Sequence, residues 1–317
     1  MKTAIIFSGQ GSQSIGMGEE LYRNFRAAKD VFDEVDDALN MHLSQIMFQG
    51  NLEELTKTEN AQPAIMAVGM AVLKTLEQEL GFDPIQKAMY VAGHSLGEYT
   101  ALCAAGAMTL SDAAKLLHLR GWAMAWASSI IYGGMSAVIG LSREQVETLI
   151  KAVSSSDHQV FIANDNCPGQ IIVSGDKEKL ALLKEEAEKI GVKKVILLAV
   201  SGAFHSPYMR PAADEMVEVM EKVILLPPRV PVISNVTAAP ETNPERIKKN
   251  LLVQITSTVR WRESIEFMQK QGADTFIEFA NGKVMAGLIR RTCPDKTVLS
   301  VGDVDSVQEA IKLLTAF

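Results

Sequence analysis

The sequence predicts an α/β core into which a small α+β subdomain is inserted. Short apolar runs alternate with longer helical patterns along most of the chain, which is typical of the strands and helices of an α/β core. The middle of the chain departs from this alternation, because its strands and helices follow the order β-α-β-β-α-β. That order is the split βαβ arrangement of a ferredoxin-like unit.

The first third of the chain supplies two units of strand and helix. The apolar run at residues 3–7 predicts a buried strand, and the loop SGQGSQ leads from it to a helical stretch at about residues 19–39. The clearest helical pattern covers residues 64–80. A second apolar run, at residues 89–92, is followed by a small-residue helical run at residues 96–105. The second unit is therefore a strand, a sharp turn and a helix.

Six segments in the middle of the chain account for the ferredoxin-like order. Strands are predicted at residues 135–141, 159–164, 170–174 and 194–199, and helices at residues 143–153 and 177–190. We therefore expect a small ferredoxin-like subdomain at residues 133–199 and a large α/β domain made of residues 1–132 and 200–317. The chain then returns to helix and strand, at residues 211–223, 230–234, 262–271 and 274–279.

Composition excludes several classes of protein. With 47% hydrophobic and 22% charged residues, the 317-residue chain can bury a large core, so we expect a globular protein. The net charge of −7 and the scattered lysines and arginines give no basic footprint for nucleic acid. The three widely spaced cysteines include no C-x-x-C pair, which favours free thiols in a reducing compartment and hence a cytoplasmic location. The N-terminal apolar run is too short for a signal peptide.

One segment, residues 121–142, could suggest a membrane span because no charge falls within it. A Gly-Gly pair and several serines interrupt the segment. We therefore expect a buried helix, a turn and a strand there, and no membrane partner.

No metal site and no cofactor are predicted. The sequence contains no H-E-x-x-H, no Cys/His pair at ligand spacing and no Walker loop. The loop Gly9-Gln10-Gly11 matches a dinucleotide-binding pattern only in part, since Ser14 stands where the third glycine belongs. The glycines of this loop therefore need an explanation other than dinucleotide binding.

The pattern G-x-S-x-G occurs between a predicted strand and a predicted helix, at Gly93-His94-Ser95-Leu96-Gly97. A tight turn in this context presents the serine hydroxyl to a cleft, and the helix N-terminus directs N–H groups at developing negative charge. We therefore predict Ser95 as a nucleophile and the backbone N–H of Leu96 as an oxyanion donor. The alternative is a glycine-rich turn with a helix-capping serine.

A serine nucleophile needs a base within hydrogen-bond reach, and the chain contains five histidines. His205 is favoured because it lies in a small-residue loop after a predicted strand, where catalytic groups commonly lie. The other four are interpreted as solvated, structural or elbow-supporting side chains: His42, His94, His118 and His158. These arguments make His205 the preferred candidate among the five.

Six segments stand in order along the chain: FSGQGSQSIGMG, AGHSLGEYTAL, LRG, NCPGQIIVSG, SGAFHSP and QITSTVRW. Together they resemble the malonyl-CoA:acyl carrier protein transacylases, acyltransferases of fatty acid and polyketide synthesis, and they cover essentially the whole chain. The resemblance implies a hydrolase-like α/β core with a nucleophile elbow, and a large domain that is catalytic. It also implies malonyl-CoA and an acyl carrier protein as partners.

The resemblance assigns catalytic roles to five residues. Ser95 would carry the acyl group, His205 would be its base, and a backbone carbonyl of Gln254 would orient His205. Gln10 and Leu96 would form the oxyanion hole, which explains the N-terminal loop. The result would be a Ser-His dyad with a neutral orienting group.

Two further residues would select the acyl group. Arg120 would bind the free carboxylate of malonyl, because a planar guanidinium can hold a carboxylate through two hydrogen bonds. Phe204 would leave little room for a methyl branch beside the acyl α-carbon. We also expect a carrier-protein surface built from local cations: Lys189, Lys193, Lys194, Arg290 and Arg291.

Some positions depart from the usual family pattern. Ser8 replaces the proline common before GQGSQ, and Ala280-Asn281 replaces a usual Gly-Pro. Trp122 and Trp126 stand where smaller or polar side chains are more usual.

The predicted reaction is a ping-pong transfer of malonyl from malonyl-CoA, through a malonyl-serine, to the phosphopantetheine thiol of the carrier protein. An acyl-thioester hydrolase with the same dyad is the alternative, in which water attacks the acyl-enzyme. A carboxylate-binding Arg120 favours transfer of a dicarboxylic acyl group. A catalytically silent acyl-binding or scaffold protein is a second alternative, which the intact Ser95, His205 and Gln10 disfavour.

Overall fold

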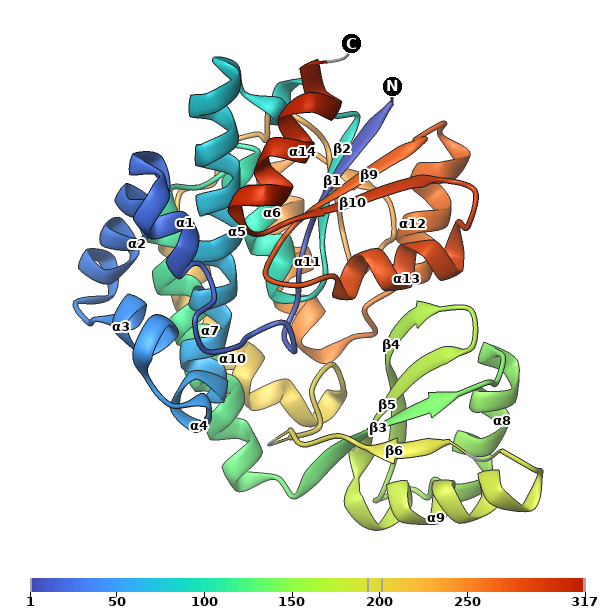
Figure 1. Cartoon of the computed structure of the whole chain (residues 1–317). Helices are drawn as coiled ribbons and strands as arrows, with labels where there is room; N and C mark the ends of the chain where they lie inside the picture. The colour runs from blue at the N-terminus through green and yellow to red at the C-terminus, as the bar shows by residue number, and fades with distance from the viewer. Residues whose placement is uncertain (1, 193, 201, 316–317) are drawn as a thin grey trace.

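The structure is a computed structural model that describes residues 2–192, 194–200 and 202–315. Figure 1 shows a larger part that contains both ends of the chain and a smaller part formed by its middle. Each part has its own sheet, of six and four strands respectively.

The strands of the larger sheet lie in the order β10-β9-β1-β2-β7-β8. They are β1 (Thr3–Phe7), β2 (Tyr90–Gly93), β7 (Val232–Ile233), β8 (Pro240–Glu241), β9 (Thr275–Phe279) and β10 (Thr297–Val301). Only β8 is antiparallel to its neighbour. Because β1, β2 and β9 are parallel and adjacent, the loops after their carboxyl ends meet at one edge of the sheet.

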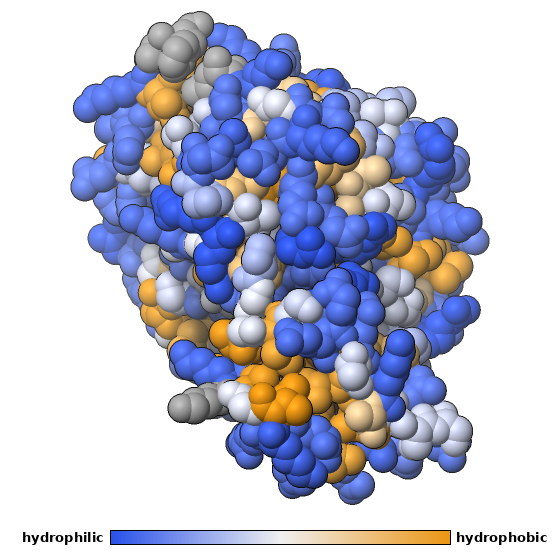
Figure 2. All heavy atoms as spheres, turned by 90° about the vertical axis from the view of Figure 1, so that its right-hand side faces the viewer, coloured by the Kyte–Doolittle hydropathy of each residue, from blue (hydrophilic) through white to orange (hydrophobic). Residues whose placement is uncertain are grey.

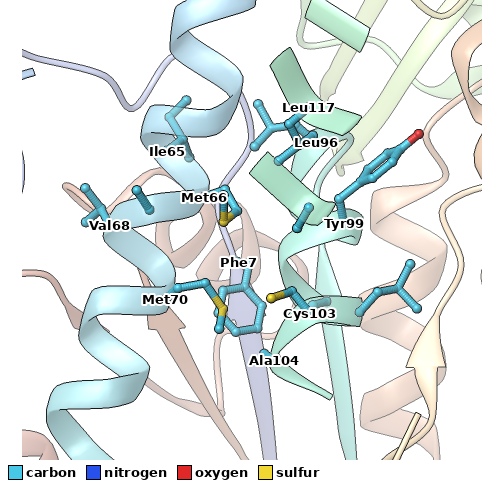
Figure 3. Packing of buried hydrophobic residues seen from close by; sticks show 14 of the residues in the cluster. Phe7, Ile65, Met66, Val68, Met70, Leu96, Tyr99, Cys103, Ala104 and Leu117 are labelled. Atoms are coloured by element: carbon cyan, nitrogen blue, oxygen red, sulfur yellow. The ribbon is translucent and has the colours of Figure 1, made fainter. Parts of the chain in front are cut away.

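Helices cover both faces of this sheet, which explains why β1 is buried throughout. Ile5 and Phe7 belong to the largest hydrophobic cluster, whereas Ala4 and Ile6 belong to a second cluster on the opposite face. Figure 3 shows Phe7 with Met70 on one side and Cys103 on the other. The side chains of β1 therefore alternate between the two helical layers.

The helices of the larger part precede, separate and follow its strands. They are α1 (Glu19–Asn24), α2 (Arg26–Leu39), α3 (Leu43–Gln49), α4 (Leu52–Thr56), α5 (Thr58–Leu80), η1 (Pro84–Lys87), α6 (Leu96–Ala104), α7 (Leu110–Ile130), η2 (Pro207–Met209), α10 (Arg210–Lys222), α11 (Pro244–Thr256), α12 (Trp261–Lys270), α13 (Val284–Thr292) and α14 (Val304–Thr315). The second cluster packs α12 and α13 against the sheet, and the first packs α5, α6 and α7 against its other face.

Side-chain caps fix the starts of two helices that carry site residues. Thr109 accepts a hydrogen bond from the N–H of Asp112 at 3.0 Å at the start of α7. Asn243 accepts one from the N–H of Arg246 at 3.0 Å at the start of α11, where Pro244 occupies the first helical position. Each cap of this kind contributes about 1 kcal/mol to helix stability.

The smaller sheet is antiparallel, with the strand order β4-β5-β3-β6. Its elements are β3 (Gly133–Ile139), α8 (Arg143–Val153), β4 (Val160–Cys167), β5 (Gln170–Asp176), α9 (Lys177–Lys189) and β6 (Val195–Leu197). This topology is consistent with the predicted ferredoxin-like unit. A separate hydrophobic cluster packs α8 and α9 on the sheet, and all its members lie between residues 138 and 195. We therefore propose residues 133–199 as the subdomain.

Strand β4 connects the two parts. The N–H of Val259 donates to the carbonyl of Ala163 at 2.8 Å, and the N–H of Asp165 donates to the carbonyl of Val259 at 3.0 Å. The buried carboxylate of Asp165 also pairs with Arg262 of α12 at 2.9 Å. These contacts hold the smaller part at a fixed place against the larger one.

The fold class predicted from the sequence is confirmed, with differences in its elements. The single helix expected at about residues 19–39 is two helices, because Phe25 has an extended backbone between them. Helices α11 and α14 and strands β8 and β10 are additions to the prediction. The uncharged residues 121–142 form the end of α7, a turn and β3. No helix of the described residues is long and apolar enough to cross a membrane.

Gly97 is required by space, and this requirement can be tested. A Cβ at Gly97 would lie 2.6 Å from the carbonyl oxygen of Phe7 and 2.7 Å from that of Ser8. Gly97→Ala is therefore expected to lower the free energy of unfolding by about 1–3 kcal/mol. Gly287, in α13, is the matched control, because a Cβ there would meet no heavy atom within 4 Å. Gly287→Ala should raise the same quantity by about 0.5–1 kcal/mol in urea denaturation. Unchanged stability in Gly97→Ala would contradict this packing.

Candidate active site

Strand β2 ends in a strained turn that carries Ser95. This residue has φ 54° and ψ −109°, outside the regions that non-glycine residues favour. A Cβ at Gly93 would lie 1.9 Å from the carbonyl oxygen of Gly97, so only glycine fits there. Ser95 is the N-cap residue of α6, yet its hydroxyl makes no capping hydrogen bond. The interpretation of Ser95 as a helix-capping serine is therefore wrong, and its hydroxyl is directed elsewhere.

The hydroxyl of Ser95 lies against His205. The distance from Ser95 Oγ to His205 Nε2 is 2.8 Å, and the distance from His205 Nδ1 to the backbone carbonyl oxygen of Gln254 is 2.9 Å. A carbonyl oxygen only accepts, so Nδ1 carries the proton and Nε2 is free to accept one from Ser95. The geometry is that of a nucleophile, a base and a neutral group that orients the base.

Burial keeps His205 neutral. The side chain is buried, and desolvation followed by the nearby charge of Arg120 lowers the pKa of His205 to about 3. A neutral imidazole is the form that accepts a proton. His205 therefore remains available as a base throughout the physiological pH range.

Arg120 of α7 is a buried cation, only 1% exposed, beside the same hydroxyl. Its Nη1 donates to Gln62 Oε1 at 2.6 Å, and its Nη2 donates to Gln254 Oε1 at 2.9 Å and to Ser95 Oγ at 3.1 Å. Its Nε has no hydrogen-bond partner, and none of the ion pairs among the described residues includes Arg120. Burial lowers the pKa of Arg120. A buried guanidinium with neutral partners favours an anionic ligand.

A network of buried polar side chains lies beneath the elbow. Gln254 Nε2 donates to the carbonyl oxygen of Ser95 at 3.0 Å and to Glu98 Oε2 at 2.6 Å. Asn235 accepts from the N–H of Ser95 at 2.7 Å and donates to the carbonyl of Gly93 at 2.8 Å. Burial raises the pKa of Glu98 to about 7, although hydrogen bonds from Asn235 and Gln254 oppose the shift. This network holds the strained turn in place.

The sequence analysis missed three members of this arrangement: Gln62, Glu98 and Asn235. Each acts through side-chain hydrogen bonds to residues distant in sequence. The one local signal is Glu98, a carboxylate within an otherwise apolar, small-residue helical run. A charged residue in such a run indicates a specific buried partner.

Two backbone N–H groups are candidates for an oxyanion hole. The N–H of Leu96 begins α6 and the N–H of Gln10 lies in the loop after β1, and neither has an acceptor within the described part of the chain. Gln10 and Ser95 line the same cavity. Unpaired donors at a helix N-terminus and in an adjacent loop suit a negative oxygen.

The cavity measures about 430 Å³ and lies between the two parts of the molecule. The larger part contributes Ser95, Arg120, Phe204 and His205, and the smaller part contributes residues of β3, β4 and β5. A cavity of this size and mixed lining is suited to a small acyl group and the end of its carrier.

Three of the other four histidines contact groups other than Ser95. His94 is partly buried and its Nε2 lies 2.9 Å from Asn166 Oδ1, His118 contacts the carbonyl of Glu59, and His158 contacts an aspartate of β5. No cluster of metal-ligating side chains occurs among residues 2–192, 194–200 and 202–315. Of the five histidines, His205 is the one in contact with Ser95.

The cations expected at a carrier-protein surface lie in two groups. They are Lys189 and Lys194 around the end of α9, Arg290 and Arg291 in the last turn of α13, and Lys193, which lies outside the described residues. Figure 1 shows α9 at the lower edge of the smaller part and α13 in the larger part.

The neutral state of His205 gives folding a measurable pH dependence. Its pKa is about 3 in the folded protein against 6.5 for an ordinary histidine, so below pH 6.5 the unfolded chain binds a proton that the folded protein does not. His205 therefore lowers the free energy of unfolding by about 2 kcal/mol as the pH falls from 7 to 5. Glutamine does not titrate in this range. Between pH 7 and 5 the free energy of unfolding should therefore fall by about 2 kcal/mol more in the wild type than in His205→Gln. Denaturant unfolding of both at the two pH values measures the difference, and parallel losses would contradict it.

Known proteins share both the sequence and the fold. The family sequence model described as the acyl transferase domain matches residues 4–313 of this chain. The malonyl CoA-acyl carrier protein transacylase of Bacillus subtilis is 42% identical over 313 residues, which cover 99% of this chain and 97% of that protein. The solved acyl-carrier-protein S-malonyltransferase of Bartonella henselae is 46% identical, with a TM-score of 0.95 and coverage of 99% of this chain and 100% of that one.

A third match comes from a solved complex of a type II polyketide synthase acyl-carrier protein with its malonyl-transacylase. The matching chain is 34% identical, with a TM-score of 0.93 and coverage of 99% of this chain and 100% of that one. The resemblance that the sequence motifs indicate is thus confirmed, and the chain belongs to the acyl transferase domain family.

Proposed function

We propose that this protein transfers the malonyl group of malonyl-CoA to the phosphopantetheine thiol of an acyl carrier protein, through a malonyl ester of Ser95. The observation that carries the proposal is the buried guanidinium of Arg120, which lies 3.1 Å from Ser95 Oγ and makes hydrogen bonds to neutral groups. Such a cation suits an acyl group with a free carboxylate. The names of the relatives support the same substrates, in fatty acid or polyketide synthesis.

The first half-reaction forms the ester. Ser95 Oγ attacks the thioester carbonyl carbon while its proton passes to His205 Nε2, 2.8 Å away. The oxyanion of the tetrahedral intermediate accepts hydrogen bonds from the N–H groups of Gln10 and Leu96. The carbon–sulfur bond then breaks, and His205 returns the proton to the sulfur of the departing CoA.

The second half-reaction repeats these steps with a different thiol. The phosphopantetheine thiol gives its proton to His205 and attacks the ester carbonyl, and the same two N–H groups hold the oxyanion. The bond to Ser95 Oγ breaks, and Ser95 regains its proton from His205. The carbonyl of Gln254 accepts from His205 Nδ1 throughout, which stabilises the imidazolium formed in each half-reaction.

Substrate choice is assigned to the two ends of the acyl group. Arg120 holds the malonyl carboxylate, so that its hydrogen bonds to neutral acceptors are replaced by bonds to an acceptor of opposite charge. Phe204, which is buried and lines the cavity beside His205, leaves little room for a methyl branch. Methylmalonyl groups are therefore excluded by space, and acetyl groups by the unpaired charge that they would leave.

The carrier protein is assigned to a surface that includes Lys189, Lys194, Arg290 and Arg291, which would meet an acidic partner. The smaller part also exposes hydrophobic side chains, among them Ile190, Ile196 and Leu197. Figure 2 shows hydrophobic residues gathered in the lower part of the view, at the height of the smaller part. The cations would complement the charge of an acidic partner, and the apolar side chains beside them would lose contact with water on binding.

An acyl-thioester hydrolase would use the same dyad and would differ only in its acceptor, because water would replace the thiol. The charge of Arg120 favours transfer of a dicarboxylic acyl group. We also propose a cytoplasmic location, which the buried free thiols of Cys103, Cys167 and Cys293 support.

Replacing Arg120 tests this proposal. Arg120→Ala should lower malonyl transfer about a hundredfold, because a charge-assisted pair in a buried site is lost. Acetyl transfer, measured with the same enzyme sample, should be unchanged or improved, since no unpaired cation remains. Steady-state assays with malonyl-CoA and acetyl-CoA measure both rates, and circular dichroism checks the fold. An equal fall for the two substrates would mean that Arg120 supports the fold and does not bind the carboxylate.

A further inference from the structure

The loop after β1 carries Gln10, yet Gln10 itself has little to hold it. Residues 8–18 form turns and no helix or strand. The one side-chain hydrogen bond of Gln10 to another described element comes from Thr58 Oγ1, at 3.4 Å. A bond of that length is weak. The position of the Gln10 N–H must therefore come from its neighbours in the loop.

Ser8 attaches the start of the loop to Glu278, a fully buried carboxylate of β9. Ser8 Oγ donates to Glu278 Oε1 at 2.9 Å, and Ser300 Oγ of β10 donates to Oε2 at 2.8 Å. The N–H groups of Met285 and Ala286, in the first turn of α13, donate to the same carboxylate at 2.9 and 3.0 Å. Four donors, two of them at a helix N-terminus, hold this carboxylate in one position.

Asn281 attaches the far side of the loop. Its Nδ2 donates to the carbonyl oxygen of Ser12 at 2.5 Å and to Ser14 Oγ at 3.0 Å. Asn281 lies in the segment that joins β9 to α13, only three residues after Glu278. Gln10 therefore lies between two attachments that lead to the same rigid segment.

The loop also contacts the elbow directly. A Cβ at Gly9 would lie 2.7 Å from the carbonyl oxygen of His94, so no space separates the two backbones there. A shift of the loop would move the N–H of Gln10 relative to that of Leu96, which is fixed by α6. The spacing of the two proposed oxyanion donors thus depends on where the loop is held.

We propose that Ser8 and Asn281 are positioning residues that set the place of the Gln10 N–H in the oxyanion hole. The inference rests on the proposed function, because it takes Gln10 as an oxyanion donor. Removal of such a donor costs about a hundredfold or more in rate, and displacement costs less. Loss of either attachment should therefore lower kcat about tenfold. Binding of malonyl-CoA should be unaffected, since neither residue contacts Arg120.

The test compares Ser8→Ala and Asn281→Ala with Ser300→Ala. Ser300→Ala is the matched control, because it removes a hydrogen bond of similar length to the same carboxylate from β10, away from the loop. Ser8→Ala and Asn281→Ala should each lower kcat about tenfold with KM for malonyl-CoA unchanged. The kcat of Ser300→Ala should stay near that of wild type.

A spectroscopic signature separates positioning from a general loss of structure. The infrared stretch of the malonyl ester carbonyl, formed from malonyl-CoA labelled at that carbon, should move to higher frequency in Ser8→Ala and Asn281→Ala, because its hydrogen bonds weaken. Ser300→Ala should keep the wild-type frequency. Asn281 is only half-buried, so Asn281→Ala provides the test even if Ser8→Ala does not fold.

Three results would overturn the inference. Equal losses of kcat in Ser8→Ala and Ser300→Ala would assign the effect to Glu278 and its packing. A wild-type carbonyl frequency in both loop variants would show that the donors had not moved. Absence of any malonyl ester on the wild-type protein would remove the proposed function itself, a failure distinct from the other two.

Discussion

The buried amide of Gln254 is the constraint on which the rest of the site depends. Its backbone carbonyl accepts from His205, its side-chain oxygen accepts from Arg120, and its side-chain nitrogen donates to Glu98 and to the carbonyl of Ser95. One residue therefore contacts the base, the cation and the nucleophile turn. Because all of these groups are buried, each needs its partner, and the site is complete only when α6, α7 and α11 are packed together.

Backbone strain and the uncompensated charge of Arg120 both occur in the active site. Ser95 and His205 both have positive φ, at 54° and 56°. Asn235 accepts a hydrogen bond from the N–H of Ser95 and donates one to the carbonyl of Gly93, and these bonds offset part of that cost by satisfying the backbone around Ser95. Arg120 remains a buried cation that is connected to the carboxyl group of Glu98 through the side-chain amide of Gln254. Folding thus supports a site that an anionic acyl group completes.

The sequence predicts those features of the fold and site that arise from local pattern. The elbow at Ser95 is recognisable because its strand, turn and helix are consecutive, and the βαββαβ order of the smaller part is likewise local. His205 could only be preferred among five histidines, since its contact with Ser95 spans 110 residues. The side chain of Glu98 accepts a hydrogen bond across 156 residues and that of Asn235 accepts one across 140 residues, and no local pattern encodes such contacts. Gln254 lies on α11, a helix that the pattern did not predict, and its contact with His205 is through the backbone.

The most direct test of this account is the intact mass of the protein after mixing with malonyl-CoA, before and after addition of a holo acyl carrier protein. The account predicts one malonyl adduct on the wild-type protein, lost when the carrier protein is added and recovered as malonyl carrier protein. Ser95→Ala should show no adduct. An adduct that persists in Ser95→Ala, or one that disappears without forming malonyl carrier protein, would contradict a transfer through Ser95.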